Sequence, residues 1–534
     1  MPIKRAIYSF GIWENSASDV VVFRLAAGDR KAESSADENA IELLEAFKPC
    51  DEIDLARWVG FPKIIFPLGA VAQLGERCIR NAEAERSIPF RSIFFRRRSL
   101  LPSFLVRGRQ YQVVPMPLPV RSLPVLQNWD CQGCTDCCRE YRVFVSAEER
   151  ARILAQAWAE DPALQNTELF TRDGGWFSGQ YRLAHRADGA CVFLNEKGGC
   201  RIHAKFGSEA KPLACRIYPF VLAPMGDHWR VGLRFACPSV TNDKGRPIAE
   251  HQAELRVYAE ALEEREGIAG RAIPVPMLQR AQSVPWTDLV QLMQTFRGIV
   301  LDERRPLEWR LRKCLAMIEL CRESRFDKIS GDRLKEFLSV IGDGINPDVP
   351  AHPEAVAPPG WIGRILFRQA MAIYARKDSG RNRGISRHGR LALLWAAWKF
   401  ANGTGRVPKV HALLPETTFE KIEEPTGPLP EASSKMLVRY YQVKLESGQF
   451  FGPTNFRRYF WDGLESLLLT YPAIRWLSRA LCDRTREESL ALALRIVDDN
   501  FGFNPLLGSR RQLIGTRMIA QRGELARLIA WYSR

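Results

Sequence analysis

The chain has 534 residues, of which 46% are hydrophobic, and carries a formal net charge of +16. Its length allows two to four domains, and the apolar fraction is ample for a packed core. The nearest approach to a membrane span, Leu391 to Ala401, is too short and is interrupted by Lys399. We therefore expect a soluble, cytoplasmic protein without a membrane partner.

The positive charge does not by itself indicate nucleic-acid binding. A nucleic-acid site needs lysines and arginines clustered on one face or along one stripe. The 77 basic residues of this chain are scattered along the sequence instead. We therefore consider a nucleic-acid partner unlikely on sequence grounds.

Residues 1–115 differ in character from the rest of the chain. They hold one short helix-like stretch, Ala40 to Phe47, followed by Gly69 to Ile93, which resembles a transfer-RNA gene read as protein. Codons of a D-arm and of a T-loop can encode parts of that second stretch. We expect a disordered or spurious extension, with translation beginning at Met116. The alternative is a genuine N-terminal domain that follows the usual patterns poorly.

Eight of the thirteen cysteines lie between Cys131 and Cys237. Cysteines two residues apart can turn their sulfurs toward one point, as zinc and iron-sulfur sites require. A disulfide framework fits less well, because such frameworks belong to small secreted domains. The predicted metal ligands are Cys131, Cys134, Cys137, Cys138, Cys191, Cys200, Cys215 and Cys237.

These ligands are expected in one or two groups. Cys131, Cys134 and Cys137 are assigned to one site. The adjacent Cys137 and Cys138 would point in different directions in an extended chain, so we expect them to serve different roles or sites.

Short strands and turns are expected around the cysteines. The predicted elements are a loop over Cys131 to Cys138, a strand over Tyr141 to Val145, a helix from a Ser146 capping box to about Trp158, a strand over Tyr181 to His185, a hairpin around Gly198-Gly199, and a strand over Trp229 to Phe235. Cys191 and Cys200 flank the hairpin, near enough to share a metal.

Other side chains close to these cysteines are candidates to support the metal. His203 follows Cys200 at i+3 and would either ligate through its imidazole or hydrogen-bond to a ligand, the second being favoured. Arg201 and Arg216 each follow a cysteine and would stabilise an anionic cluster, unless they are solvated surface arginines. Tyr218 completes the set of candidates.

These motifs resemble those of a known family. The run C-x-x-C-x-x-C-C, followed by C-V-F-L, G-C-R-I-H and C-R-I-Y-P-F, is similar to the zinc- or iron-chelating cysteine-cluster proteins (YkgJ-like), which include flagellin lysine N-methylases (FliB-like). The match covers roughly residues 127–240. The resemblance implies a chelated metal centre. For some members it also implies methylation of protein lysine with S-adenosylmethionine, with flagellin as a protein substrate.

Helices are expected to dominate after Lys244. The predicted helices are His251 to Glu264, Leu307 to Arg325, Trp361 to Ala375, Arg387 to Ala401, Met436 to Glu446, Arg457 to Tyr471, Arg486 to Asp499 and Arg511 to Tyr532. Cys314 and Cys321 share an apolar face and should be core residues. The expected class is α+β, with a cysteine-cluster module over 116–245 and an α-helical domain over 246–534.

Three functions remain open from the sequence. The first is a protein lysine N-methyltransferase, for which the sequence shows no G-x-G-x-x-G after a strand and no C-x-x-x-C-x-x-C of the radical enzymes. The second is a non-catalytic metal-binding protein that docks a partner through its helical domain. The third is an iron-sulfur oxidoreductase. The identity of the metal would test the third function, because an oxidoreductase of this kind needs an iron-sulfur cluster and a closed zinc site is structural.

Overall fold

The computed structural model describes residues 118–534 apart from 122–126, 157, 174–178, 269–270 and 272, together with two short strands near the N-terminus. The chain divides into two compact units, Met1–Val71 and Ala72–Arg534, and each is described by itself. In the first unit, β1 (Ile12–Trp13) pairs antiparallel with β2 (Val22–Phe23). The predictions for the Ala40 to Phe47 helix, the transfer-RNA-like stretch and the Met116 start lie outside the described residues.

Three small sheets occupy the region from residue 118 to 247. Their strands are β3 (Val120–Arg121), β4 (Asn128–Trp129), β5 (Phe144–Val145), β6 (Phe170–Asp173), β7 (Gln180–Leu183), β8 (Phe220–Met225), β9 (His228–Leu233) and β10 (Arg246–Pro247). The sheet orders are β5-β7-β6, β3-β9-β8 and β4-β10, and only the β3-β9 pair is parallel. The predicted strands over Tyr181 to His185 and Trp229 to Phe235 correspond to β7 and β9.

Short helices are more frequent around the cysteines than the sequence suggested, although most of these helices contain no cysteine themselves. These helices are α3 (Asp136–Glu140), α4 (Ala147–Leu154), α5 (Arg201–Phe206), α6 (Leu213–Ile217) and α7 (Pro238–Thr241). The predicted capping box at Ser146 and Glu149 is confirmed. The helix ends before Trp158, whose indole N–H donates to the carbonyl of Ile153 at 2.9 Å and so satisfies a terminal acceptor.

Two local predictions were wrong. The tight cysteine run is a loop only as far as Thr135, because Asp136 begins helix α3 with a favourable acidic first turn. The hairpin around Gly198 has no strands, only single bridges at His185–Cys191 and Leu194–Cys200. After Cys200 the chain enters α5 instead of returning as a strand.

Longer helices follow from residue 252 onward. They are α8 (Gln252–Glu266), α9 (Trp286–Leu301), α10 (Leu307–Glu323), α11 (Asp332–Gly344), α12 (Trp361–Tyr374), α13 (Arg390–Asn402), α14 (Phe419–Glu423), α15 (Glu431–Ser447), α16 (Phe460–Leu468), α17 (Thr470–Ala480), α18 (Arg486–Asn500), α19 (Arg510–Gln521) and α20 (Glu524–Ser533). Together with the small sheets they confirm the α+β class. None of the helices in the described part of the chain combines the length and apolar character that a membrane span requires.

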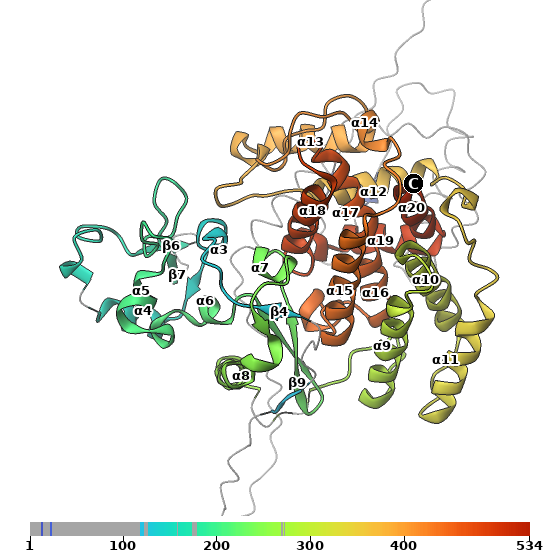
Figure 1. Ribbon diagram of the computed structural model, residues 1–534, viewed down its shortest axis with the longest axis horizontal. Helices are drawn as coiled ribbons and strands as arrows, with labels where there is room; N and C mark the ends of the chain where they lie inside the picture. Colours follow the sequence, from blue (N-terminus) through green and yellow to red (C-terminus); the bar gives the residue numbers. More distant parts are fainter. Residues whose placement is uncertain are drawn as a thin grey trace, which may run out of the picture. The chain divides into compact units, whose positions relative to one another are not determined.

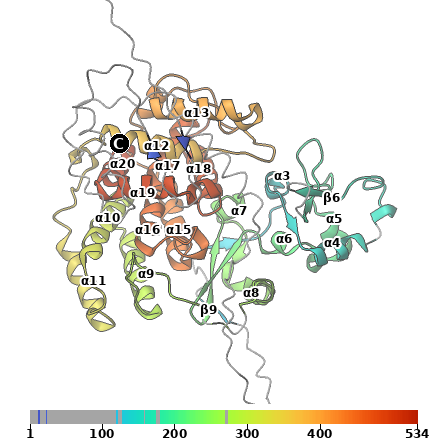
Figure 2. The ribbon, with the colours of Figure 1, turned by 180° about the vertical axis from the view of Figure 1, so that it is seen from behind.

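Two hydrophobic cores hold the second unit together. The smaller, which we call the satellite core, packs the elements between α4 and α6. Its buried residues are Ile153, Trp158, Leu164, Leu183, Ala184, Val192, Phe193 and Ile202. The larger, the main core, contains the sheet β3-β9-β8 and helices from α8 to α20. Figures 1 and 2 show α15, α16, α17 and α18 side by side in this main core.

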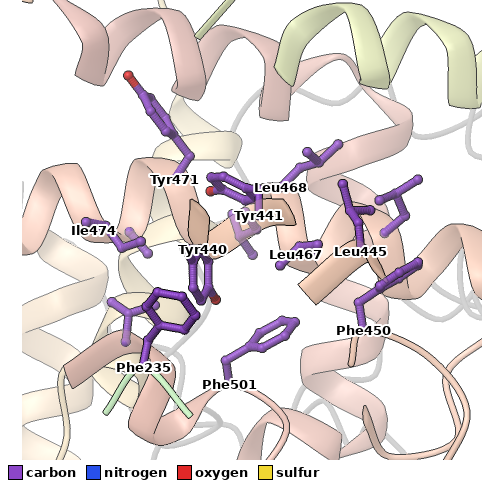
Figure 3. Close-up of a cluster of buried hydrophobic side chains, with 14 of the residues drawn as sticks. Phe235, Tyr440, Tyr441, Leu445, Phe450, Leu467, Leu468, Tyr471, Ile474 and Phe501 are labelled. Atoms are coloured by element: carbon purple, nitrogen blue, oxygen red, sulfur yellow. The ribbon is translucent and has the colours of Figure 1, made fainter. Parts of the chain in front are cut away.

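The main core also takes in the chain just before Cys237. Phe235 packs edge-to-face on Tyr440 of α15, with ring centroids 5.1 Å apart, as Figure 3 shows within the cluster. Cys237 is itself buried in this core. Cys314 and Cys321 of α10 are fully buried there, as predicted from their shared apolar face.

Candidate metal centre

The first cysteines lie on a tightly turned segment. Gly133 and Thr135 both have left-handed backbone angles, with φ of +64° and +65°, which turn the chain between Cys131 and α3. Cys131 and Cys134 are exposed, whereas Cys137 and Cys138 of α3 are half-buried. The turn therefore presents two sulfurs to solvent and leads two into the protein.

Cys137 and Cys138 do not sit on extended chain. They are consecutive residues of a helix, and their sulfurs lie 3.9 Å apart. The contact between the two thiols lowers the pKa of Cys138 to about 7 and raises that of Cys137. Cys138 is therefore the thiol of this pair that ionises first.

Cys138 lies beside three cysteines from later segments. The N–H of Cys191 donates to the carbonyl of Cys138 at 2.8 Å. A single bridge between Leu194 and Cys200 then brings Cys200 back toward Cys191. Cys191, Cys200 and Cys215 all pack against the satellite core. We call Cys138, Cys191, Cys200 and Cys215 the inner group.

The thiols of the inner group raise one another's pKa values. Burial raises the pKa of Cys215 well above its usual range, and Cys191, Cys138 and Cys200 raise it further. Burial also raises the pKa of Cys191 to about 12, with Cys138 and Cys200 adding to it. Thiolates act on each other in this way only when they are neighbours. A metal cation among them would compensate the charges that burial and mutual repulsion disfavour.

Cys200 gains support from the start of α5. It is the N-cap residue of that helix. Burial raises the pKa of Cys200, and the backbone N–H groups of His203 and Ile202 oppose that rise. A helix N-terminus is a favourable place for a thiolate.

A second set of thiols surrounds Cys134. Although the residue as a whole is exposed, partial desolvation of its thiol raises the pKa of Cys134, and the charges of Asp136, Cys237 and Cys131 raise it further. Cys131 and Cys134 also contribute to the raised pKa of Cys137. We call Cys131, Cys134, Cys137 and Cys237 the outer group. It contains the three cysteines that the spacing assigned to one site, and Cys237 joins them from the beginning of α7.

The predicted supporting residues differ in what they contact. Arg201 pairs with Asp161 at 3.2 Å, and Arg216 pairs with Glu209, so both guanidinium groups bind carboxylates. The side chain of His203 is exposed.

Tyr218 packs beside Tyr141, the residue that follows α3. Its ring centroid is 5.2 Å from that of Tyr141. Burial raises its pKa, with Tyr141 and Cys237 as neighbouring charges. Tyr218 is therefore associated with the outer group.

Lys211 was not singled out by the sequence analysis. Its ammonium lowers the pKa of Cys138, Cys200 and Cys215, three of the four inner thiols. The only sequence signal is its place four residues before Cys215, which on its own resembles any surface lysine. Two arginines also act on single inner thiols: Arg139 lowers the pKa of Cys138, and Arg186 opposes the rise at Cys191.

Ionic contacts join α3 to the main core. Asp136 accepts a hydrogen bond from Arg495 of α18 at 2.5 Å. Tyr141, just after α3, donates to Asp499 at 2.8 Å, and Lys377 donates to the same carboxylate at 2.6 Å. These partners are more than 100 positions apart in the sequence, so no local pattern could predict them. The helix that carries Cys137 and Cys138 is thus anchored at both ends.

The donor chemistry fits a thiolate-bound metal. All eight cysteines are free thiols, and they gather in two groups that meet at Cys137 and Cys138. As arranged here, no three His, Cys, Asp or Glu side chains of the described residues are placed as ligands of one ion. Soft thiolates suit zinc, copper(I) and iron-sulfur clusters, and burial disfavours a bare thiolate charge.

Comparisons with known proteins agree with this chemistry. Residues 130–242 match the CxxCxxCC family, whose description is "Putative zinc- or iron-chelating domain". The chain is also 33% identical over 95 residues to an uncharacterized protein of Methanocaldococcus jannaschii. That match covers 17% of this chain and 29% of the relative's length. No solved structure matches the chain.

Proposed function

We propose that this chain, whose residues 130–242 match the CxxCxxCC family, is a metal-binding protein with two four-thiolate centres. The inner centre would use Cys138, Cys191, Cys200 and Cys215, and the outer centre Cys131, Cys134, Cys137 and Cys237. Four thiolates complete a tetrahedral zinc site or hold one iron-sulfur cluster. Two such centres would use all eight cysteines of the region.

One observation carries this proposal. The N–H of Cys191 donates to the carbonyl of Cys138 at 2.8 Å, and the charge on Cys138 raises the pKa of Cys191, Cys200 and Cys215. Cys131 and Cys134 instead raise the pKa of Cys137. Cys137 and Cys138, although consecutive in the sequence, therefore belong to different groups of thiols in space. The Cys137–Cys138 contact is the point where the two sets meet.

Metal analysis of single variants tests the proposal. Cys215→Ser and Cys237→Ser should each lower the metal-to-protein ratio to about half, and the double variant should hold almost none. Cys314→Ser, in the main core, is the matched control and should keep the full ratio. Complete loss of metal from either single variant would replace two centres by one shared centre. Unchanged metal in both variants would remove the assignment altogether.

The identity of the metal is a separate step. A closed zinc centre is colourless and structural, whereas an iron-sulfur cluster absorbs in the visible and can pass electrons. Visible absorbance of anaerobically purified protein, together with iron, zinc and acid-labile sulfide content, distinguishes the two. A colourless zinc protein would eliminate the iron-sulfur oxidoreductase.

The activity that we propose from the family resemblance is S-adenosylmethionine-dependent methylation of a protein lysine, with flagellin as a candidate substrate. The non-catalytic alternative is a metal-holding protein whose helical domain, over 246–534, docks a partner beside the module over 116–245. Incubation of the metal-loaded chain with labelled S-adenosylmethionine and flagellin separates them, because only the enzyme transfers label to lysine. Free thiols in this number support a reducing compartment such as the cytoplasm.

A further inference from the structure

A cavity of about 340 Å³ lies within the helical region, and none of the eight cysteines of the candidate metal centre lines it. Its walls come from α10, from the connector that contains Val349 and Val356, from α16, and from the turn between α19 and α20. Helices α10, α19 and α20 are neighbours in Figures 1 and 2. The volume lies in the range that small-molecule sites occupy.

The polar groups in the wall are already paired. Arg322 donates to Glu465 at 2.7 Å and to Asp462 at 3.1 Å. Arg312 donates to Glu308 at 2.8 Å and to the carbonyl of Pro350 at 2.9 Å. Each guanidinium therefore has a carboxylate partner, and these buried pairs hold α10, α16 and the connector in place.

The floor of the cavity is apolar. We give this name to the apolar lining residues, which are Leu315 and Ala316 of α10, Val349 and Pro350 of the connector, and Ala526 of α20. Small and aliphatic residues leave room for an aliphatic chain and give it no hydrogen-bond partner. This composition suits the body of an apolar ligand.

The rim carries negative charge that the wall does not neutralise. Glu319, Glu323 and Asp348 line the cavity and are exposed. Within the described residues these three carboxylates form no ion pair. The local excess is opposite in sign to the net charge of +16 of the whole chain. A ligand held here would gain from a positive end that lies at the rim.

We propose that this cavity binds an alkylammonium ion, with its aliphatic chain on the floor formed by Leu315, Val349 and Ala526 and its ammonium group at the rim of Glu319, Glu323 and Asp348. A lysine side chain and a free aliphatic amine share this chemistry. The arrangement disfavours an anion of the same length, because the rim would repel its charge.

Three probes of equal length test the charge preference. In ligand-observed NMR titrations at low salt, n-pentylammonium should bind at least about tenfold more tightly than 1-pentanol, and pentanoate should bind most weakly. Added salt should reduce the advantage of the cation, because the rim is exposed. Binding of pentanoate as tight as that of pentylammonium would overturn the proposal.

Matched variants place the binding in this cavity. The double variant Glu319→Gln with Glu323→Gln should weaken pentylammonium binding about tenfold, whereas Glu260→Gln with Glu336→Gln, two exposed glutamates on α8 and α11, should leave it unchanged. Ala316→Phe should abolish binding by filling the floor, with retained folding checked by circular dichroism. Equal weakening by both pairs of glutamine substitutions would overturn the site. If Ala316→Phe misfolds, the glutamine variants alone determine whether pentylammonium binds at this cavity.

The lysine and free-amine sources are then separated by competition. A lysine-containing peptide blocked at both ends should displace n-pentylammonium if the cavity admits protein side chains. Displacement by 1,5-diaminopentane without displacement by the peptide would limit the site to free amines. Failure of both to displace the probe would overturn the assigned chemistry.

Discussion

The satellite core and the main core depend on different forces. The satellite core buries few apolar side chains between short helices and two-residue to four-residue strands, and half-buried cysteines line it. The main core buries whole faces of helices, including the rings of Trp461, Trp476 and Tyr440. A small core of that kind commonly needs a metal or a cross-link to be stable, whereas a large one does not. The difference indicates that metal holds the first region together and hydrophobic burial holds the second.

Removal of the metal should have the largest effect on the difference in stability between the two regions. A structural zinc site contributes about 10–16 kcal/mol to small domains that depend on it. We expect a strong chelator to raise amide hydrogen exchange throughout the segments around α3 to α6, while α15 to α18 stay protected. Hydrogen-exchange mass spectrometry with and without the chelator measures this. Equal protection of both regions after metal loss would show that the satellite core stands without metal.

Truncation of a main-core ring should have the converse effect. Trp476 is fully buried and lies 5.9 Å from the ring of Phe400. We expect Trp476→Ala to cost about 3–5 kcal/mol of unfolding free energy, because it leaves a cavity in a packed core. The metal content of the folded protein should stay the same. Trp398→Ala, at a ring that is 41% exposed, is the control and should cost far less. Loss of metal from folded Trp476→Ala would mean that the two regions are not independent.

A substitution at the junction between the two regions, by which we mean the contacts around Asp499, should have an intermediate effect on stability. Asp499 accepts hydrogen bonds from Tyr141, Arg234 and Lys377. Asp499→Ala would remove the carboxylate that the half-buried Arg234 and Lys377 share, leaving Lys377 only the more distant Glu140 at 3.9 Å. We therefore expect a loss of about 1.5–3 kcal/mol in urea unfolding and faster exchange around Tyr141. Asp483→Ala, at an exposed carboxylate that pairs with its neighbour Arg484, is the control. If both variants are equally stable, the junction contributes nothing.

The helices were the most predictable part of the fold. Apolar spacing located α8, α10, α12 and α18 to within a few residues, because each buries one long face. The prediction that ended one helix at Tyr471 missed α17. Pro472 lies in the first turn of that new helix, where the absence of its N–H costs nothing.

Other helix boundaries depended on the backbone at single residues. Gly523, with φ of +67°, divides the predicted helix over Arg511 to Tyr532 into α19 and α20. Phe456 and Arg457 have positive φ, so α16 begins only at Phe460. Helix α9 was missed although Leu289, Leu292 and Phe296 repeat at helical spacing. Left-handed angles at non-glycine residues carry no clear sequence signal.

The thiols of the candidate metal centre were evident from the sequence, and their grouping in space less so. The spacing alone indicated thiolate ligands and joined Cys131, Cys134 and Cys137. The place of Cys237 beside them depends on the sheet β3-β9-β8, which joins the main core. The role of Lys211 depends on how the chain folds back near α6. Both are consequences of tertiary packing, which local patterns do not contain.

The smallest effect that we expect is a pH dependence at the junction. His411 is 4% exposed and lies near Lys377 and Asp499. Burial, and then the charge of Lys377, lowers the pKa of His411 to about 4. Its Nδ1 accepts a hydrogen bond from the N–H of Leu413 at 3.2 Å, which holds the neutral ring in place. In the unfolded chain a histidine titrates near pH 6.5, so acid favours unfolding here.

The sign of this dependence follows from the lowered pKa. The neutral His411 contributes its full stability above about pH 6.5, and that contribution is lost as the pH falls toward 4, by on the order of 1–3 kcal/mol. We expect His411→Asn, whose side-chain oxygen can still accept from Leu413, to lose less stability than the wild type between pH 6.5 and 4.5. His388→Asn, at an exposed histidine, should follow the wild type. Because acid protonates the metal thiolates equally in all three proteins, the difference between their urea-unfolding curves isolates His411. Parallel loss of stability in wild type and His411→Asn would show that the junction does not respond to this histidine, and that acid acts on the two regions only through the metal.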